Sequence, residues 1–266
     1  MIRPGIGAAL VAAFCCGAVS ADPPAEAFDA DIVLLGEQHD NPEHHARQAE
    51  WVHALAPRAL VFEMLTPEQA SAIADERPQD EKALDAVLGW ADSGWPDFAM
   101  YYPIFAAAPE ARVFGAGVGR ETLQGLRDRD LAELAGPEGA RFGLDADLPE
   151  AQQADRMALQ RAAHCDALPE DLLPMMVSAQ RLRDAALAGA ALDAIAATGG
   201  PVVVITGNGH VRADWGATAL LRKAAPELGI FALGQGENGE APEGSFDAVE
   251  DAAPVDRGDP CEAFVK

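Results

Sequence analysis

Residues 31–42 of the chain, DIVLLGEQHDNP, join an apolar run to a glycine turn that carries Glu37 and His39. A second stretch, residues 202–210 with the sequence VVVITGNGH, has the same pattern and ends at His210. An apolar run that stops at a glycine turn is typical of a strand buried in a parallel sheet. The carboxyl ends of parallel strands lie along one edge of the sheet, where ligands bind. We therefore expect the two histidines to meet at that edge with the glutamate beside them.

Three shorter apolar runs are interpreted as further strands, at residues 59–62, 112–115 and 229–233. The stretches between them have helical patterns. Asn41 and Thr66 are suitable helix caps, because each is followed by a proline at the first helical position. A mostly helical stretch separates the third strand from the fourth. This alternation predicts an α/β fold with a mainly parallel sheet flanked by helices, and the long helical stretch predicts a subdomain or lid.

Acidic residues dominate the charge of the chain. Its 266 residues are enough to bury a sizeable core. They include 43 Asp and Glu against 19 Lys and Arg, which gives a formal net charge of -24. Such a surface repels phosphate backbones, so we do not expect nucleic acid as a partner.

The first 21 residues have the features of a signal peptide. Residues 6–19 are apolar and small, and small residues precede a cleavage point before Asp22. The apolar run is too short to span a membrane as a helix. We therefore expect a secreted or periplasmic protein with one mature domain, residues 22–266, whose tail is irregular from about residue 234.

The four cysteines divide into two pairs. Cys15 and Cys16 lie in the leader, where a lipid anchor is the less favoured alternative, because Phe14 fits a lipoprotein cleavage site poorly. Cys165 and Cys261 remain in the mature chain. In an oxidising compartment we favour a disulfide between them, which would tie the C-terminal tail to the helical region. The alternative is two unrelated thiols.

Two carboxylates accompany the two histidines. An imidazole can ligate a metal or act as an acid or base near neutral pH, and a carboxylate beside it can orient it or bind the metal itself. Glu63 ends the second apolar run and is expected on the same edge as Glu37. A carboxylate there loses solvation unless it is paired or functional. The alternative role for Glu63 is a cap on the turn at Thr66.

Five other residues are weaker candidates. His44 and His45 fall in the first turn of a helix, so one of them can reach the site while the other faces away; the alternative is that both are solvated. Tyr101 and Tyr102 lie in an aromatic stretch that is either a core or interface cluster, or an apolar wall for a flat ligand with a phenolate on its iron. Arg120 can pair with a carboxylate of the ligand or of the protein.

An ordered set of motifs makes the sequence recognisable. They run from about residue 29 to 233 and comprise LLGEQHDNP at 34–42, FEM at 62–64, YYPI at 101–104, His164-Cys165, Ala179-Gln180 with Arg183-Asp184, and GNGH at 207–210. The set resembles the ChaN-like haem-binding uptake family, part of a wider group with the erythromycin esterases and the Tiki and TraB proteins. The resemblance implies an α/β core with a helical part and iron ligated by a tyrosine, for which Tyr101 is the best match by position. It also implies a homodimer that holds haem between its subunits, with the outer-membrane haem-uptake machinery as a partner.

Two functional hypotheses follow, and binding is favoured over catalysis. The first is an exported haem-binding protein, whose expected cofactor-binding residues are Tyr101, Tyr102, Arg120, His39, His45 and His210. The second is a hydrolase of the Tiki or erythromycin esterase type, acting with or without a divalent metal. Its catalytic or metal-ligating residues would be Glu37, His39, Glu63 and His210. A degenerate scaffold that binds only a partner protein is a third alternative.

Overall fold

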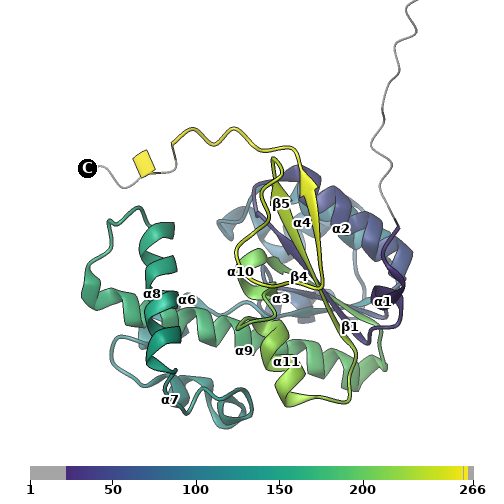
Figure 1. Cartoon of the computed structure of the whole chain (residues 1–266). Helices are drawn as coiled ribbons and strands as arrows, with labels where there is room; N and C mark the ends of the chain where they lie inside the picture. Colours follow the sequence, from purple (N-terminus) through teal and green to yellow (C-terminus); the bar gives the residue numbers. More distant parts are fainter. Residues whose placement is uncertain (1–21, 260, 263–266) are drawn as a thin grey trace, which may run out of the picture.

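The fold centres on one six-stranded sheet in which every neighbouring pair of strands is parallel (Figure 1). A computed structural model of the chain describes residues 22–259, 261 and 262. The strand order is β3-β2-β4-β1-β5-β6. The strands are β1 (Ile32–Glu37), β2 (Ala59–Phe62), β3 (Arg112–Gly115), β4 (Val202–Gly207), β5 (Ile230–Glu237) and β6 (Ala248–Ala252). The predicted α/β fold is confirmed, and all five predicted strands are present.

The sixth strand, β6, lies in a segment that was predicted to be irregular. It pairs with the second half of β5 and forms one edge of the sheet. Its sequence, AVEDA, alternates between half-buried and exposed residues and carries two acidic side chains. Short, charged strands are common at sheet edges, where no continuous apolar run is needed. The apolar-run criterion that identified the other strands therefore does not detect this one.

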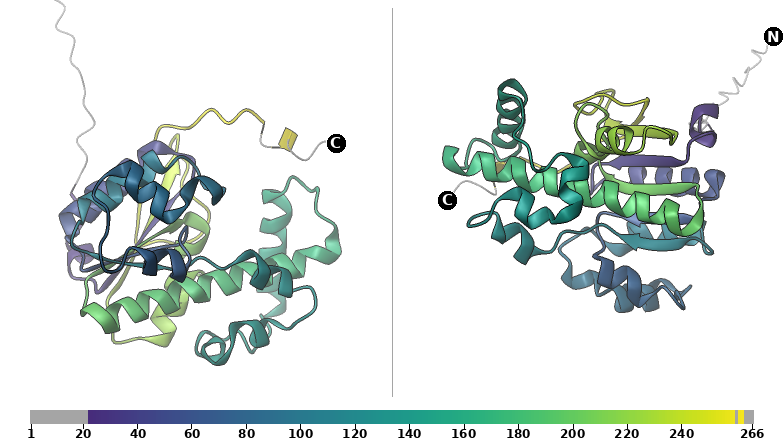
Figure 2. Two further views of the ribbon diagram at one scale, coloured as in Figure 1. Left: turned by 180° about the vertical axis from the view of Figure 1, so that it is seen from behind. Right: turned by 90° about the horizontal axis from the view of Figure 1, so that it is seen from below.

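Helices cover both faces of the sheet (Figures 1 and 2). One face packs against α2 (Pro42–Leu55) and α5 (Phe98–Ala107). The opposite face packs against α9 (Leu173–Thr198) and α11 (Ala217–Ala224). Successive residues of a strand point to opposite faces, so alternate residues of β1 enter two separate apolar cores. The central strands are buried on both sides, as expected of a parallel sheet.

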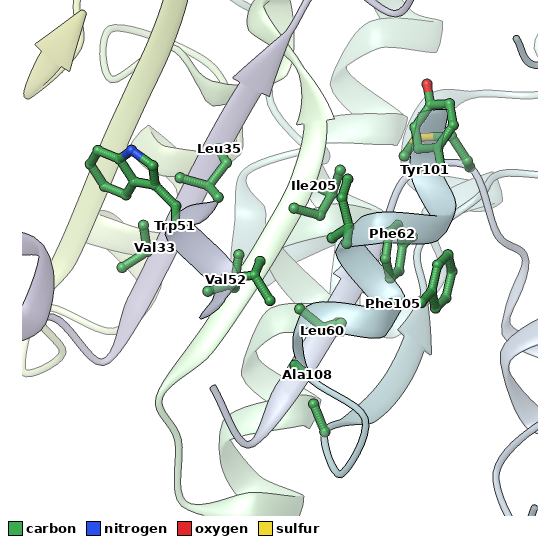
Figure 3. Packing of buried hydrophobic residues seen from close by; sticks show 14 of the residues in the cluster. Val33, Leu35, Trp51, Val52, Leu60, Phe62, Tyr101, Phe105, Ala108 and Ile205 are labelled. Carbon is green, nitrogen blue, oxygen red and sulfur yellow. The ribbon is translucent and has the colours of Figure 1, made fainter. Parts of the chain in front are cut away.

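The first of these cores reaches the carboxyl ends of the strands (Figure 3). Phe62 at the end of β2 stacks on Phe105 of α5, with ring centroids 4.3 Å apart and planes only 7° from parallel. Tyr101, one turn earlier on α5, belongs to the same core and is 0% exposed. A rigid aromatic layer therefore supports the edge of the sheet at which the site is expected.

Two helices begin as the sequence predicted. The Asn41 side chain accepts a hydrogen bond from the backbone N–H of Glu43, with a proline at the first position of α2. Thr66 caps α3 (Pro67–Ala72) in a reciprocal arrangement with Gln69. Satisfying the first backbone donors in this way determines where each helix starts.

Residues 120–172 form a helical arm beside the sheet (Figures 1 and 2). Its elements are α6 (Arg120–Gly125), α7 (Leu131–Ala135), the 3-10 turn η2 (Pro137–Phe142), α8 (Glu150–Ala163) and the 3-10 turn η3 (Glu170–Leu172). Part of the stretch that was expected to be mostly helical, residues 120–135, is thus two short helices. From the arm, α9 continues along the sheet and joins the two parts. This arm corresponds to the predicted subdomain.

The predicted disulfide is present between Cys165 and Cys261. Cys165 follows α8 in the helical arm, so the bond ties the C-terminal tail to the arm. The remaining elements are α1 (Ala25–Phe28), α4 (Glu81–Leu88), the 3-10 turn η1 (Trp90–Asp92) and α10 (Asn208–Val211). Among the helices of the described residues, none combines the length and the apolar character that a membrane span requires. The expected signal peptide lies outside the described residues.

Candidate functional site

The turns that follow β1, β2 and β4 bring four predicted residues together. These strands are neighbours in the order β2-β4-β1, and Glu37 at the end of β1 lies opposite Gly207 at the end of β4. Glu63 directly follows β2. Its carboxylate lies 4.0 Å from Nε2 of His39 and 3.5 Å from Nε2 of His210. The two histidines therefore meet around one glutamate at the carboxyl edge of the sheet.

Glu37 is the centre of one buried polar cluster. Its Oε1 accepts a hydrogen bond from the Tyr101 hydroxyl at 2.8 Å and lies 2.7 Å from Nδ1 of His39. Its Oε2 accepts a hydrogen bond from Nε2 of Gln48 at 2.9 Å and lies 3.4 Å from Nδ1 of His45. Burial raises the pKa of Glu37, but the bond to His39 and the nearby imidazoles outweigh burial and hold that pKa below its ordinary value. The group therefore stays ionised at neutral pH.

Glu63 is the centre of a second cluster. Its Oε2 accepts hydrogen bonds from the Thr206 hydroxyl at 2.6 Å and from the backbone N–H of Gly207 at 3.0 Å. His210, whose Nε2 lies near Glu63, has its other ring nitrogen, Nδ1, 2.7 Å from Oδ1 of Asp184. The bonds of Glu63 are to β4, and the turn at Thr66 is capped by other groups. The alternative role of Glu63 as a cap on that turn is therefore wrong.

Electrostatics favour a charged His210 between two carboxylates. Burial lowers the pKa of this imidazole, but the charge of Glu63 and the bond to Asp184 raise it to about 9. Burial raises the pKa of Glu63, and the opposing attraction of His210 and His39 brings it down to about 2. For Asp184, burial outweighs the bond to His210, and its pKa is raised. The negative charge of this cluster is thus largely balanced by its own histidines.

His39 is the histidine that faces the solvent side of the site. Its side chain is 35% exposed, and its ring meets the edge of Trp95 at a centroid distance of 4.9 Å. Burial lowers its pKa, but the bond to Glu37 and the charge of Glu63 raise it above its ordinary value. Glycine is needed at position 207, because a Cβ there would lie 2.9 Å from Nε2 of His39. Within the described residues, Nε2 makes no hydrogen bond.

Two adjoining cavities open onto this edge. One, of about 730 Å³, lies towards β3 and α6 and is lined by Trp95, Met64 and Met176 among others. The other, of about 560 Å³, lies towards α8 and α10. His39, Gln180 and His210 line both. Cavities of this size hold ligands as large as a drug or cofactor.

The other predicted site residues lie in different places. His45 contacts Glu37 and the Tyr101 ring, with centroids 4.2 Å apart, whereas His44 faces away and bonds to the backbone of residues 38 and 236. Tyr102 lies outside both cavities, and its hydroxyl donates to the carbonyl oxygen of residue 79. Arg120 is exposed and lines the larger cavity. One of the two neighbouring histidines thus reaches the site, as the helical spacing requires.

The tentative metal set is not supported by the geometry. Among the described residues, no group of three or more His, Cys, Asp or Glu is placed to hold a metal ion. The reason is that both glutamates are held by hydrogen bonds from protein donors, Glu37 by Tyr101 and Glu63 by Thr206 and a backbone N–H. What the cluster can do is move protons, because an imidazole between carboxylates is an acid and a base.

Two residues of the polar clusters were not predicted as site residues. Gln48 is on α2, eleven positions after Glu37, and supports that carboxylate. Asp184 is on α9 and orients His210. A sequence signal for Asp184 was available. It is a carboxylate on the buried face of an alanine-rich helix, and it follows Arg183 in one of the motifs noted above.

Comparisons with known proteins agree with this fold. A family model described as haem-binding uptake, Tiki superfamily, ChaN matches residues 24–221. A solved structure titled cofacial heme binding to ChaN of Campylobacter jejuni is similar at a TM-score of 0.63 and 19% identity, covering 84% of this chain and 88% of that one. The type III effector HopBA1 gives a TM-score of 0.46 at 14% identity, covering 86% and 90%. No curated protein matches. Because the family model spans most of the sequence, this chain belongs to the ChaN haem-binding uptake family of the Tiki superfamily.

Proposed function

We propose that this chain binds haem in the two adjoining cavities, with His39 as the ligand of the iron. The family match supports haem as the ligand, and it favours binding over hydrolysis. The observation that carries the proposal is the state of the His39 ring. Its Nδ1 is held by Glu37, whereas its Nε2 makes no hydrogen bond among the described residues and lies 4.0 Å from Glu63, and the residue lines both cavities. Metal-ligating histidines usually have one ring nitrogen oriented by a carboxylate in this way.

The lining of the cavities suits a flat porphyrin. The larger cavity offers the Trp95 indole and the thioethers of Met64 and Met176 as apolar surface. Haem also carries two carboxylates, which an acidic protein would repel unless cations line the site. Arg120 and Arg183 line the larger cavity, and two further arginines line the smaller one. Four arginines therefore line the two cavities of a chain whose net charge is strongly negative.

Neither tyrosine of the chain suits the iron. Tyr101 and Tyr102 are the two tyrosines in the sequence. Tyr101 is buried, and its hydroxyl donates to Glu37. Burial and the charge of Glu37 raise the pKa of Tyr101, and Tyr101 lines neither cavity. Tyr102 lines neither cavity, and its hydroxyl donates to the carbonyl oxygen of residue 79. These surroundings argue against the tyrosine ligation that the family resemblance implies, and they support a role for Tyr101 in holding the carboxylate that orients His39.

The test is a haemin titration followed by the Soret band and by electron paramagnetic resonance. We expect the wild type to shift the Soret band, and His39→Ala to weaken binding and change the iron spin state. Tyr101→Phe should keep the wild-type spectrum. His53→Ala is the matched control, because His53 is exposed on the far side of α2. No shift with the wild type would reject haem binding; loss of the spectrum in folded Tyr101→Phe, with His39→Ala unaffected, would reject the ligand assignment.

We further propose export and a role in haem uptake. The apolar leader supports export, and the disulfide between Cys165 and Cys261 is compatible with an oxidising compartment. Mass spectrometry of the protein from the periplasmic or culture fraction should give a chain that starts at Asp22. A homodimer holding haem between its subunits, and the outer-membrane uptake machinery as a partner, remain predictions. The first is tested by light scattering with and without haemin, the second by co-purification.

A further inference from the structure

A buried arginine in the smaller cavity has no anionic partner among the residues that the structure describes. Arg156, on α8 of the helical arm, is 9% exposed. In the part of the chain that the structure describes, no carboxylate lies within ion-pair distance of it. One terminal nitrogen donates a long hydrogen bond of 3.4 Å to the carbonyl oxygen of Trp215, and its buried Nε has no partner. Buried charges in folded proteins are normally paired, so this guanidinium requires an explanation.

The neighbours of Arg156 hold its position without neutralising it. Its guanidinium carbon lies 5.1 Å from the centroid of the Trp215 ring, and that of Arg212 lies 3.7 Å from the same centroid. Arg212 forms a two-bond ion pair with Asp214, at 2.9 and 2.7 Å. The neighbouring arginine therefore has its own anion, and a second positive charge lies beside Arg156. An additional anion at this place would be attracted by both.

The carboxylates that line the same cavity are engaged elsewhere. Glu37 is held by His39, Tyr101 and Gln48, and Asp184 by His210. The third, Glu243, is exposed at the rim. Burial lowers the pKa of Arg156, with the charge of Asp184 acting in the opposite direction. A guanidinium nevertheless remains cationic at neutral pH, so the wall of the cavity keeps an uncompensated charge.

We propose that Arg156 is the carboxylate-binding residue of this site and pairs with a propionate of the haem. The planar guanidinium fork matches a carboxylate with two parallel hydrogen bonds. The cavity that Arg156 lines is also lined by His39, so a porphyrin with its iron at that histidine has a carboxylate within reach of the arm. This assignment rests on the proposed haem binding. It replaces Arg120, the residue expected for this role, which is exposed in the other cavity.

The test compares haemin with haemin dimethyl ester, in which both carboxylates are blocked. Arg156→Gln should raise the Kd for haemin at least about tenfold, as expected for losing a charged hydrogen bond. It should leave the Kd for the ester unchanged, because the ester cannot make the pair. Arg156→Lys should recover only part of the loss, because an ammonium lacks the fork. Arg129→Gln is the matched control, because Arg129 lines neither cavity and pairs with Glu133 at an exposed position of the same arm.

Equal weakening of both porphyrins by Arg156→Gln would overturn the assignment, and so would no effect on either. If the wild type binds no haemin, the proposed function fails, and the anion site is tested separately. Inorganic phosphate is then titrated into the full chain while the Nε–H resonance of Arg156 is followed by NMR, assigned by its loss in Arg156→Lys. A saturable shift would support an anion site for another ligand, and an unmoved resonance would reject it.

Discussion

The carboxyl edge of the sheet and the helical arm line the same cavities, but they differ in whether their charged side chains are paired. At the edge, every carboxylate has donors from the protein: Glu63 has Thr206 and a backbone N–H, and His210 lies between two acids. On the arm, Arg156 is buried with no anionic partner in the described part of the chain. An internally neutralised cluster stays in place when no ligand is bound, whereas an unpaired charge gains most when an anionic ligand arrives. The sheet edge therefore holds its polar side chains in place without a ligand, whereas the arm carries the charge that an anionic ligand would pair with.

The largest expected effect is in the core beneath the sheet edge. Phe62→Ala removes a fully buried ring stacked on Phe105 and should lower the free energy of unfolding by about 3–5 kcal/mol. The measurement is denaturant unfolding followed by circular dichroism. Phe28→Ala is the control, because Phe28 is half exposed and should change the same quantity by less than about 0.5 kcal/mol. Similar losses in the two variants would show that the edge is not supported by a rigid core.

A smaller effect is expected at the link between the arm and the tail. Replacing Cys165 and Cys261 by serine removes a cross-link across 96 residues and should cost about 2–4 kcal/mol, because the unfolded chain is no longer constrained. Hydrogen exchange should rise in α8 and the tail but not in β1 or β4. Wild-type protein treated with a reductant is the matched control. Unchanged exchange in α8 would mean that the arm is held by its packing alone.

The smallest effect concerns the tail beyond β6, which is bound to the sheet by half-buried ion pairs. Arg257 bonds to Asp40 and Glu237, each at 2.6 Å. The bond to Arg257 is the main cause that lowers the pKa of Glu237 to about 2 and that of Asp40 below its ordinary value. A folded-state pKa below the unfolded one stabilises the fold above the unfolded pKa, and the contribution disappears as pH falls towards the folded pKa.

Arg257→Gln should therefore lower the free energy of unfolding near pH 7 by about 1 kcal/mol or less per pair. The difference from the wild type should shrink between about pH 4.5 and pH 2, where the carboxylates become protonated in both states. Urea unfolding at several pH values measures it. A difference that persists unchanged at about pH 2 would show that Arg257 stabilises the tail through packing instead.

Much of the fold was predictable because its signals are local. Five strands were apolar runs, and the caps at Asn41 and Thr66 were visible as a capping residue followed by proline. The strand β6 was not predicted, because an acidic edge strand needs only pairing with β5 and shows no apolar run. The stretch that was expected to be mostly helical is divided near its start, since a turn after Gly125 separates α6 from α7.

The site was predictable in its place and less so in its contacts. Turns after parallel strands share one edge, so Glu37, His39, Glu63 and His210 were expected together. The hydrogen-bond partners of these residues were not predictable, because they come from helices that pack over that edge. Asp184 reaches His210 from α9, and Tyr101 reaches Glu37 from α5, 64 residues away in the sequence. No local sequence pattern indicates contacts between residues so far apart in the chain.

The sequence by itself determined that this chain is an α/β protein with a Glu and His pocket at the carboxyl edge of a parallel sheet. It could do so because strand periodicity and glycine turns are properties of neighbouring residues. Only the tertiary structure decided which side chains the pocket presents. It buries Tyr101 against Glu37, leaves the ring of His39 partly exposed and places Arg156 in the cavity wall with no anion from the described residues. Burial and pairing are properties of residues that are distant in the chain, and packing alone brings them together.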